Sequence, residues 1–139
     1  MRTFGYYHAG QDCTAACRIY AGPKIYEKVV AELTAAVSTI KAGLQDEDGV
    51  EIGPLISDRQ RNRVASFVER AQMAGHMEVT TGGKERVGNG FFYEPTVIAG
   101  ARQDDEMPHG GLKSSGYGKD MSMYALEDYT VARHIMARF

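Results

Sequence analysis

The residues most informative about how this chain folds lie close to its start and read Tyr7-His8-Ala9-Gly10-Gln11-Asp12-Cys13-Thr14-Ala15-Ala16-Cys17-Arg18. Gly10 allows the backbone to turn tightly before Cys13, so that the thiol and its own backbone N–H can face one pocket. This pairing suits acyl chemistry, because the sulfur attacks a carbonyl group while the N–H stabilises the oxyanion that develops. The alternative is that Cys13 is a small buried apolar residue, and spacing alone favours this alternative.

Beyond this stretch the sequence predicts a strand over residues 18–21 and then a helix. Pro23 suits the first helical position, where its missing N–H would be unpaired in any case. Gly43 stands where a left-handed C-cap is expected. The apolar residues that recur at helical spacing between them are Ile25, Val29, Leu33, Val37 and Ile40.

A polar loop over residues 45–56 leads to a second predicted helix. Ser57 followed by Gln60 forms a capping-box pattern, and the helix is expected to end near Gly75. Strands are expected over residues 77–81 and 91–98, with a glycine-rich turn over 82–90 between them. A last helix over 124–128 and a last strand over 130–136 complete the chain. This order of helices and strands favours an α/β fold.

Composition excludes several classes of function. The net charge is -2 and the pI is about 6.1, so the chain offers no basic surface for nucleic acid. No apolar run has membrane-spanning length, and no signal-peptide pattern follows Met1. Two cysteines four positions apart do not form a disulfide framework, and we expect a reducing, cytoplasmic location.

Two other site types fail on spacing. Cys13 and Cys17 with His8 and His109 match no common zinc-binding pattern, so we expect no metal site. The loop over residues 110–119 is rich in glycine, but it lacks the Gly-Lys-Ser/Thr triplet of a phosphate-binding loop, because Asp120 follows Lys119.

Residues 7–18 resemble the catalytic-cysteine motif of the NAD(P)-dependent aldehyde dehydrogenase superfamily. Further landmarks of that catalytic domain follow in the same order, and together they span nearly the whole chain. Within the superfamily, residues 12–18 and 107–111 are most similar to the γ-aminobutyraldehyde dehydrogenases. The further landmarks are Gly53-Pro54-Leu55, Thr81-Gly82-Gly83, Gly90-Phe91-Phe92-Tyr93-Glu94-Pro95-Thr96-Val97 and Pro108-His109-Gly110-Gly111-Leu112-Lys113-Ser114-Ser115-Gly116.

The resemblance implies a role for four residues. Cys13 would attack an aldehyde to form a thiohemiacetal, from which hydride passes to NAD(P) before water hydrolyses the thioester. Asp12, Thr14 and His109 match positions that flank the aldehyde pocket. An acidic Asp12 would favour the ammonium group of an aminoaldehyde such as 4-aminobutyraldehyde.

The departures from the family are equally informative. The family's Rossmann cofactor domain, its oxyanion asparagine and its general-base glutamate precede the cysteine, and we expect all three to be absent. His8 also stands where the family usually has asparagine. A further family segment, which grips the nicotinamide ribose, has no counterpart between Glu106 and Met107.

We therefore expect a partial catalytic domain. Residues 1–106 would be its first part and residues 107–139 its C-terminal segment, joined across a deletion. Such a chain would not bind NAD(P) and would be inactive alone. Two alternatives remain open: a non-catalytic module that forms a homo-oligomer through the strand at 130–136, and a weak esterase that depends on Cys13.

Overall fold

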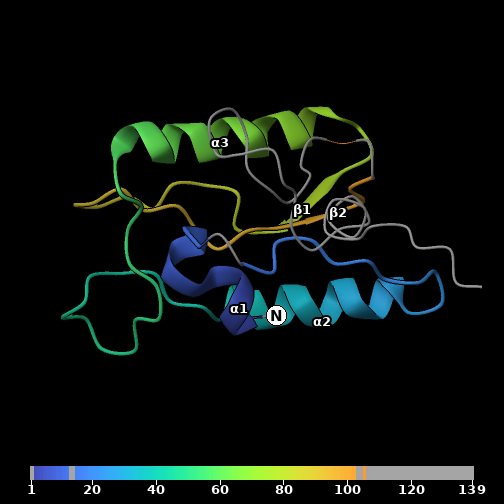
Figure 1. Ribbon diagram of the computed structural model, residues 1–139, viewed down its shortest axis with the longest axis horizontal. Coiled ribbons are helices and arrows are strands. Elements are labelled where there is room, and N and C mark those ends of the chain that lie inside the picture. Colours follow the sequence, from blue (N-terminus) through green and yellow to red (C-terminus); the bar gives the residue numbers. More distant parts are fainter. Residues whose placement is uncertain (1, 13–14, 103–104, 106–139) are drawn as a thin grey trace, which may run out of the picture. The chain divides into compact units, whose positions relative to one another are not determined.

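The computed structural model describes residues 2–12, 15–102 and 105 (Figure 1). Residues up to Ala101 belong to one compact unit and residues from Arg102 onward to a second. The predicted helix over 124–128 and the predicted strand over 130–136 lie outside the described residues. The elements of the first unit are helices α1 (Arg2–Tyr6), α2 (Tyr26–Ser38) and α3 (Asp58–Met73), the 3-10 helix η1 (Tyr7–Gly10), and strands β1 (Glu78–Thr81) and β2 (Val97–Ala99).

The centre of this unit is an antiparallel pair of strands with a helix on each side. In the β1–β2 register, Glu78 lies opposite Ala99 and Thr81 opposite Val97, with an irregularity between Val79 and Thr81. Figure 1 shows α2 and α3 on opposite sides of this pair, and both helices contact β1. The hydroxyl oxygens of Thr34 on α2 and Thr80 on β1 are 2.6 Å apart. The unit is therefore α/β, as the sequence predicts.

The hydrophobic core lies where the end of α2, the loop after it and the start of β2 meet. Phe92 is only 3% exposed and Val37 only 1%. Tyr6 from α1 and Leu33 from α2 pack against this core, so the segment that precedes Cys13 is attached to it. The buried members of the core are Val37, Ile40, Ala42, Ile52, Phe92 and Val97.

The predictions for α3 and β1 are confirmed. The Ser57 hydroxyl oxygen accepts a hydrogen bond from the backbone N–H of Gln60 at 3.2 Å, as an N-cap should. The helix ends at Met73, and Gly75 follows with φ +70°. Residues 78–81 form β1 within the predicted 77–81.

The predicted limits of α2 are wrong at both ends. Residues 23–25 form a turn in which Ile25 N–H donates to Gly22 O, and the helix begins only at Tyr26. It ends at Ser38, so Gly43 is not its C-cap. Instead the Gly43 N–H donates to Ile52 O beside a parallel bridge, and a Cβ at this position would meet the side chains of Val50 and Glu47.

The remaining strand predictions are corrected in two places. Residues 18–21 form no strand, because no described segment pairs with them and Tyr20 is 76% exposed. The predicted strand over 91–98 is regular only from Val97 to Ala99, with one isolated bridge between Tyr93 and Glu85. Pro95 interrupts it, because proline has no N–H to donate to a partner strand.

Candidate active site

The backbone before the predicted nucleophile turns through a rare conformation. Three consecutive residues have positive φ: His8 at 51°, Ala9 at 56° and Gly10 at 73°. Left-handed backbone costs a residue with a side chain about 1–2 kcal/mol, so His8 and Ala9 need support from their surroundings. The tight turn predicted at Gly10 is confirmed. Strained backbone of this kind is concentrated at functional sites in proteins.

The side chain of Gln11 supplies part of that support. Its Nε2 donates to His8 O at 3.2 Å, while its Oε1 accepts from the backbone N–H of Ile56 at 3.0 Å. Gln11 thus closes the left-handed turn and fastens it to the loop before α3. The sequence does not predict this role, because no sequence pattern marks Gln11 apart from its polar side chain.

The chain is also anchored on both sides of the predicted nucleophile. Ala15 is buried, and its N–H donates to Asp12 O at 3.2 Å. The N–H of Ala16 donates to Phe4 O at 3.3 Å, which ties the segment back to α1. Asp12 is half-buried. Cys13, Thr14 and His109 lie outside the described residues, so of the four predicted site residues only Asp12 has a described position.

An open hollow of about 610 Å³ adjoins this segment. It brings the left-handed turn together with the loop before α3 and with Phe91, whose O accepts a hydrogen bond from Leu55 N–H at 2.9 Å. Most of the lining is apolar, which suits an organic substrate better than an ion. The residues that line it are His8, Gln11, Pro54, Leu55, Ile56 and Phe91.

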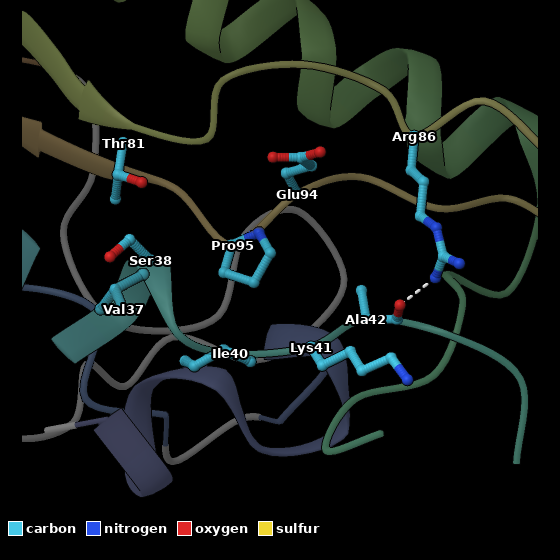
Figure 2. A pocket seen from close by; sticks show the side chains of 9 residues that line it. All are labelled: Val37, Ser38, Ile40, Lys41, Ala42, Thr81, Arg86, Glu94 and Pro95. Atoms are coloured by element: carbon cyan, nitrogen blue, oxygen red, sulfur yellow. Dashed lines mark hydrogen bonds between the residues drawn. The ribbon is translucent and has the colours of Figure 1, made fainter. Parts of the chain in front are cut away.

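A second hollow, of about 300 Å³, lies between α2 and the segments that flank the strand pair (Figure 2). Arg86 at its edge donates to Ala42 O, lies 3.4 Å from a carboxylate oxygen of Glu47 and sits 5.4 Å from the ring centre of Phe92. The backbone N–H of Leu44 and, more weakly, Arg86 hold the pKa of Glu47 below its ordinary value. Arg86 thus ties the loop after α2 to the segment that carries Phe92.

Neither a metal cluster nor a membrane helix is found in the part of the chain that the structure describes. No three His, Cys, Asp or Glu side chains of that part lie close enough to hold a metal ion. No helix there has the length and apolar character needed to cross a bilayer.

The described residues do not fit a dinucleotide cofactor. A Rossmann site has parallel strands and a glycine-rich turn that leads from a strand into a helix N-terminus. Here the strands are antiparallel, and Gly82 and Gly83 lead from β1 into a loop.

Comparison with known sequences places this geometry in context. A sequence model described as the aldehyde dehydrogenase family matches residues 2–107. The chain is 35% identical over 99 residues to a mitochondrial aldehyde dehydrogenase of Leishmania tarentolae, covering 71% of this chain and 20% of that protein. It is 37% identical over 103 residues to succinate-semialdehyde dehydrogenase [NADP(+)] 2 of Schizosaccharomyces pombe, covering 73% of this chain and 21% of that protein. The chain thus spans about a fifth of the length of these relatives.

Solved structures agree with the sequence relatives. An aldehyde dehydrogenase of Bacillus cereus, solved as its NAD+ complex, superposes with a TM-score of 0.69 at 33% identity and covers 73% of this chain and 21% of its own. A lactaldehyde dehydrogenase of Escherichia coli gives a TM-score of 0.69 at 32% identity, with 74% and 22% covered. The described unit therefore has the fold of one section of these larger enzymes.

Proposed function

Because this chain belongs to the aldehyde dehydrogenase family, we propose that it carries the nucleophile segment of an enzyme that oxidises an aldehyde to an acid. The nucleophile is Cys13, which the family match includes. The observation that carries the proposal is the strained turn at His8 and Ala9 directly before Cys13, anchored by Gln11 next to an apolar hollow. Residues 1–106 and 107–139 are two parts of one catalytic domain.

The chemistry of the first step follows from the residue types. The Cys13 thiolate forms a bond to the aldehyde carbon, and the electron pair of the C=O bond moves to oxygen, which takes up a proton to give a thiohemiacetal. The backbone N–H of Cys13 donates to that oxygen as its negative charge develops. By the family resemblance, Asp12, Thr14 and His109 match positions that flank the aldehyde pocket.

We propose an aminoaldehyde as the substrate, with 4-aminobutyraldehyde as the first compound to test. The relatives are named for different aldehydes, succinate semialdehyde and betaine aldehyde among them. The proposal therefore rests on Asp12, whose carboxylate lies next to the nucleophile in sequence and would attract an ammonium group. In an intact homologue, the variant that corresponds to Asp12→Ala should lose its preference for amino over neutral aldehydes. Equal loss on both would contradict the assignment.

We propose that the chain alone does not complete the oxidation. Removal of hydride from the thiohemiacetal needs an acceptor, and the described residues do not fit NAD(P). Hydrolysis of an acyl-enzyme also needs a general base, whose absence slows the step by about 10²–10⁴-fold. We therefore expect an activated acyl group to react with Cys13, and we expect the acid to be released slowly.

Labelling with an activated ester such as p-nitrophenyl acetate tests this function. Peptide mass spectrometry should find the acetyl group mainly on Cys13. Cys17, which is exposed, serves as the accessible comparison and should be acetylated only weakly. Cys13→Ser should abolish the fast phase of p-nitrophenol release, whereas the matched control Cys17→Ser should retain it. Equal acylation of both cysteines, or an unchanged fast phase in Cys13→Ser, would refute Cys13 as the activated nucleophile.

A second candidate function, a non-catalytic interaction module, is favoured by the exposed apolar surface. Phe4 is 72% exposed, Tyr7 66% and Ile56 81%, and a partner chain could cover these apolar side chains. The partner would be an intact subunit of a homologous aldehyde dehydrogenase, with residues 130–136 adding a strand to it. Co-elution of the two chains in size-exclusion chromatography would support this function, and separate elution would remove it.

A further inference from the structure

The loop between the two strands contains an Asn-Gly pair near its most exposed described side chain, Val87. Asn89 and Gly90 are both exposed, and Val87 just before them is 99% exposed. Gly88 and Gly90 have φ of 149° and 132°, so the backbone on each side of Asn89 is in a region that side chains rarely adopt. The chain has one other asparagine, Asn62, which lies on α3.

We propose that Asn89 is a site of spontaneous deamidation, which converts it to aspartate and isoaspartate. The backbone nitrogen of Gly90 loses its proton and attacks the side-chain carbonyl carbon of Asn89. A new C–N bond forms, and the bond to the amide nitrogen breaks as that nitrogen takes up the proton and leaves as ammonia. Water then opens the resulting succinimide at either carbonyl. The only co-reactant is water, and no oxidant or reductant takes part.

The local structure leaves the attacking nitrogen free. Within residues 2–12, 15–102 and 105, no hydrogen bond holds the Gly90 N–H or the side-chain amide of Asn89. The glycine also has no Cβ that would hinder the approach of its nitrogen to the side chain. Both groups that must react are therefore exposed and unconstrained.

Asn62 provides a contrast within the same chain. It is also exposed, but its Nδ2 donates to a carboxylate oxygen of Asp58 at 3.0 Å. The following nitrogen, that of Arg63, lies inside α3 (Figure 1), where helical hydrogen bonding fixes it away from the side chain. Exposure is thus alike at the two asparagines, and the freedom of the backbone differs.

The modification would act on a loop that returns directly to the core. Phe92, two residues after Gly90, is 3% exposed, and a methyl group at Gly90 would collide with its ring. Isoaspartate adds one carbon to the backbone at position 89 and one negative charge to the loop. We therefore expect aged protein to unfold at a lower urea concentration than fresh protein.

The test is to incubate the whole chain at about pH 8 and about 37 °C and to follow deamidation by mass spectrometry. The tryptic peptide 87–102 contains Asn89 and no other amide side chain. This peptide should gain about 1 Da. Its unmodified form should disappear at least roughly tenfold faster than unmodified Asn62, which is followed in fragments of the Lys-C peptide 42–84. Protein isoaspartyl methyltransferase should then methylate the aged chain.

A matched variant separates modification from general ageing. Asn89→Gln keeps an amide but closes the ring far more slowly, so the aged variant should keep its urea midpoint and accept no methyl group within residues 87–102, which contain no aspartate. Equal rates at Asn89 and Asn62, or methylation of aged Asn89→Gln to the same extent as the parent, would overturn the proposal.

Discussion

Tyr6 is the residue that joins the N-terminal helix to the strand pair. Its hydroxyl donates to Thr96 O at 2.8 Å, and its ring packs against the core. Burial raises the pKa of Tyr6 from 10.0 to about 12, because an ionised phenol would lose hydration there. Residues 7–18 follow α1 directly, so the contacts of Tyr6 also hold the start of that segment against the core.

Tyr6→Phe should lower the free energy of unfolding by about 1 kcal/mol, because the Thr96 carbonyl loses its hydrogen-bond donor. Urea unfolding of the variant and of Tyr20→Phe, whose ring is 76% exposed, measures the difference. The exposed control should change stability little. Equal effects of the two substitutions would show that the Tyr6 hydroxyl contributes nothing.

The raised pKa of Tyr6 also predicts a pH dependence. The folded chain holds the phenolic proton more tightly than the unfolded chain, so the stabilisation is complete below the ordinary pKa of 10.0 and is lost as pH rises toward about 12. Wild-type stability should therefore fall more steeply over this range than that of Tyr6→Phe. Parallel curves for the two proteins would contradict the raised pKa.

At the scale of helices and strands, local signals were predictive where they are self-contained. The Ser57 cap acts within four residues, and it gave the start of α3 correctly. The ends of α2 and the strand at 18–21 were predicted wrongly because they depend on residues far away in the sequence: Gly43 pairs with Ile52, and no described strand pairs with residues 18–21. Of the site, the turn at Gly10 was predictable, whereas the tie from Gln11 to Ile56 joins segments far apart in sequence.

Removal of the α3 cap tests its contribution. Ser57→Ala should cost about 1 kcal/mol in unfolding free energy, because the Gln60 N–H loses its side-chain acceptor and keeps only the backbone oxygen of Ser57. Ser38→Ala is the matched control, since that hydroxyl donates only to Ala35 O within its own helix. Urea unfolding followed by circular dichroism compares the two. A cost at Ser38 as large as that at Ser57 would argue against a specific cap.

The turn after β1 depends on the close approach of two backbones. Gly82 has φ +72°, and a Cβ there would overlap the carbonyl group of Pro95. Gly49 has nearly the same φ, +73°, but has open space around it.

Gly82→Ala and Gly49→Ala therefore share the cost of left-handed backbone, about 1–2 kcal/mol, and only the first adds a collision. We expect Gly82→Ala to be the more destabilising by at least about 1 kcal/mol. Thermal unfolding of both variants measures the difference, and equal losses would show that Pro95 moves aside without cost.

At the scale of the whole molecule, the family was recognisable because its landmarks occur in the right order along the chain. Helical and strand periodicity indicates only an α/β fold, and many unrelated functions share that class. The described unit superposes on about a fifth of a family enzyme. Its limited core and its exposed apolar side chains, such as Phe4 and Ile56, are consistent with a section of a larger fold.

The lack of fit to a dinucleotide predicts that NAD(P) does not stabilise this chain. A ligand that binds only the folded state raises the unfolding midpoint, and the stabilisation grows with the logarithm of the ligand concentration divided by its dissociation constant. Urea unfolding with and without saturating NAD should give superimposable curves. An upward shift of the midpoint with NAD would mean that the chain contains a folded cofactor site.

The rate of NAD(P) reduction by the purified chain with 4-aminobutyraldehyde tests the central claim most directly. We predict that NAD(P) reduction has the same rate with wild type and with Cys13→Ser. The same samples should show that the activated ester acylates wild type and not Cys13→Ser. That result would place the nucleophile in this chain and the hydride acceptor site outside it. A rate of reduction that depends on Cys13 would contradict the account, because the chain would then be a complete aldehyde dehydrogenase.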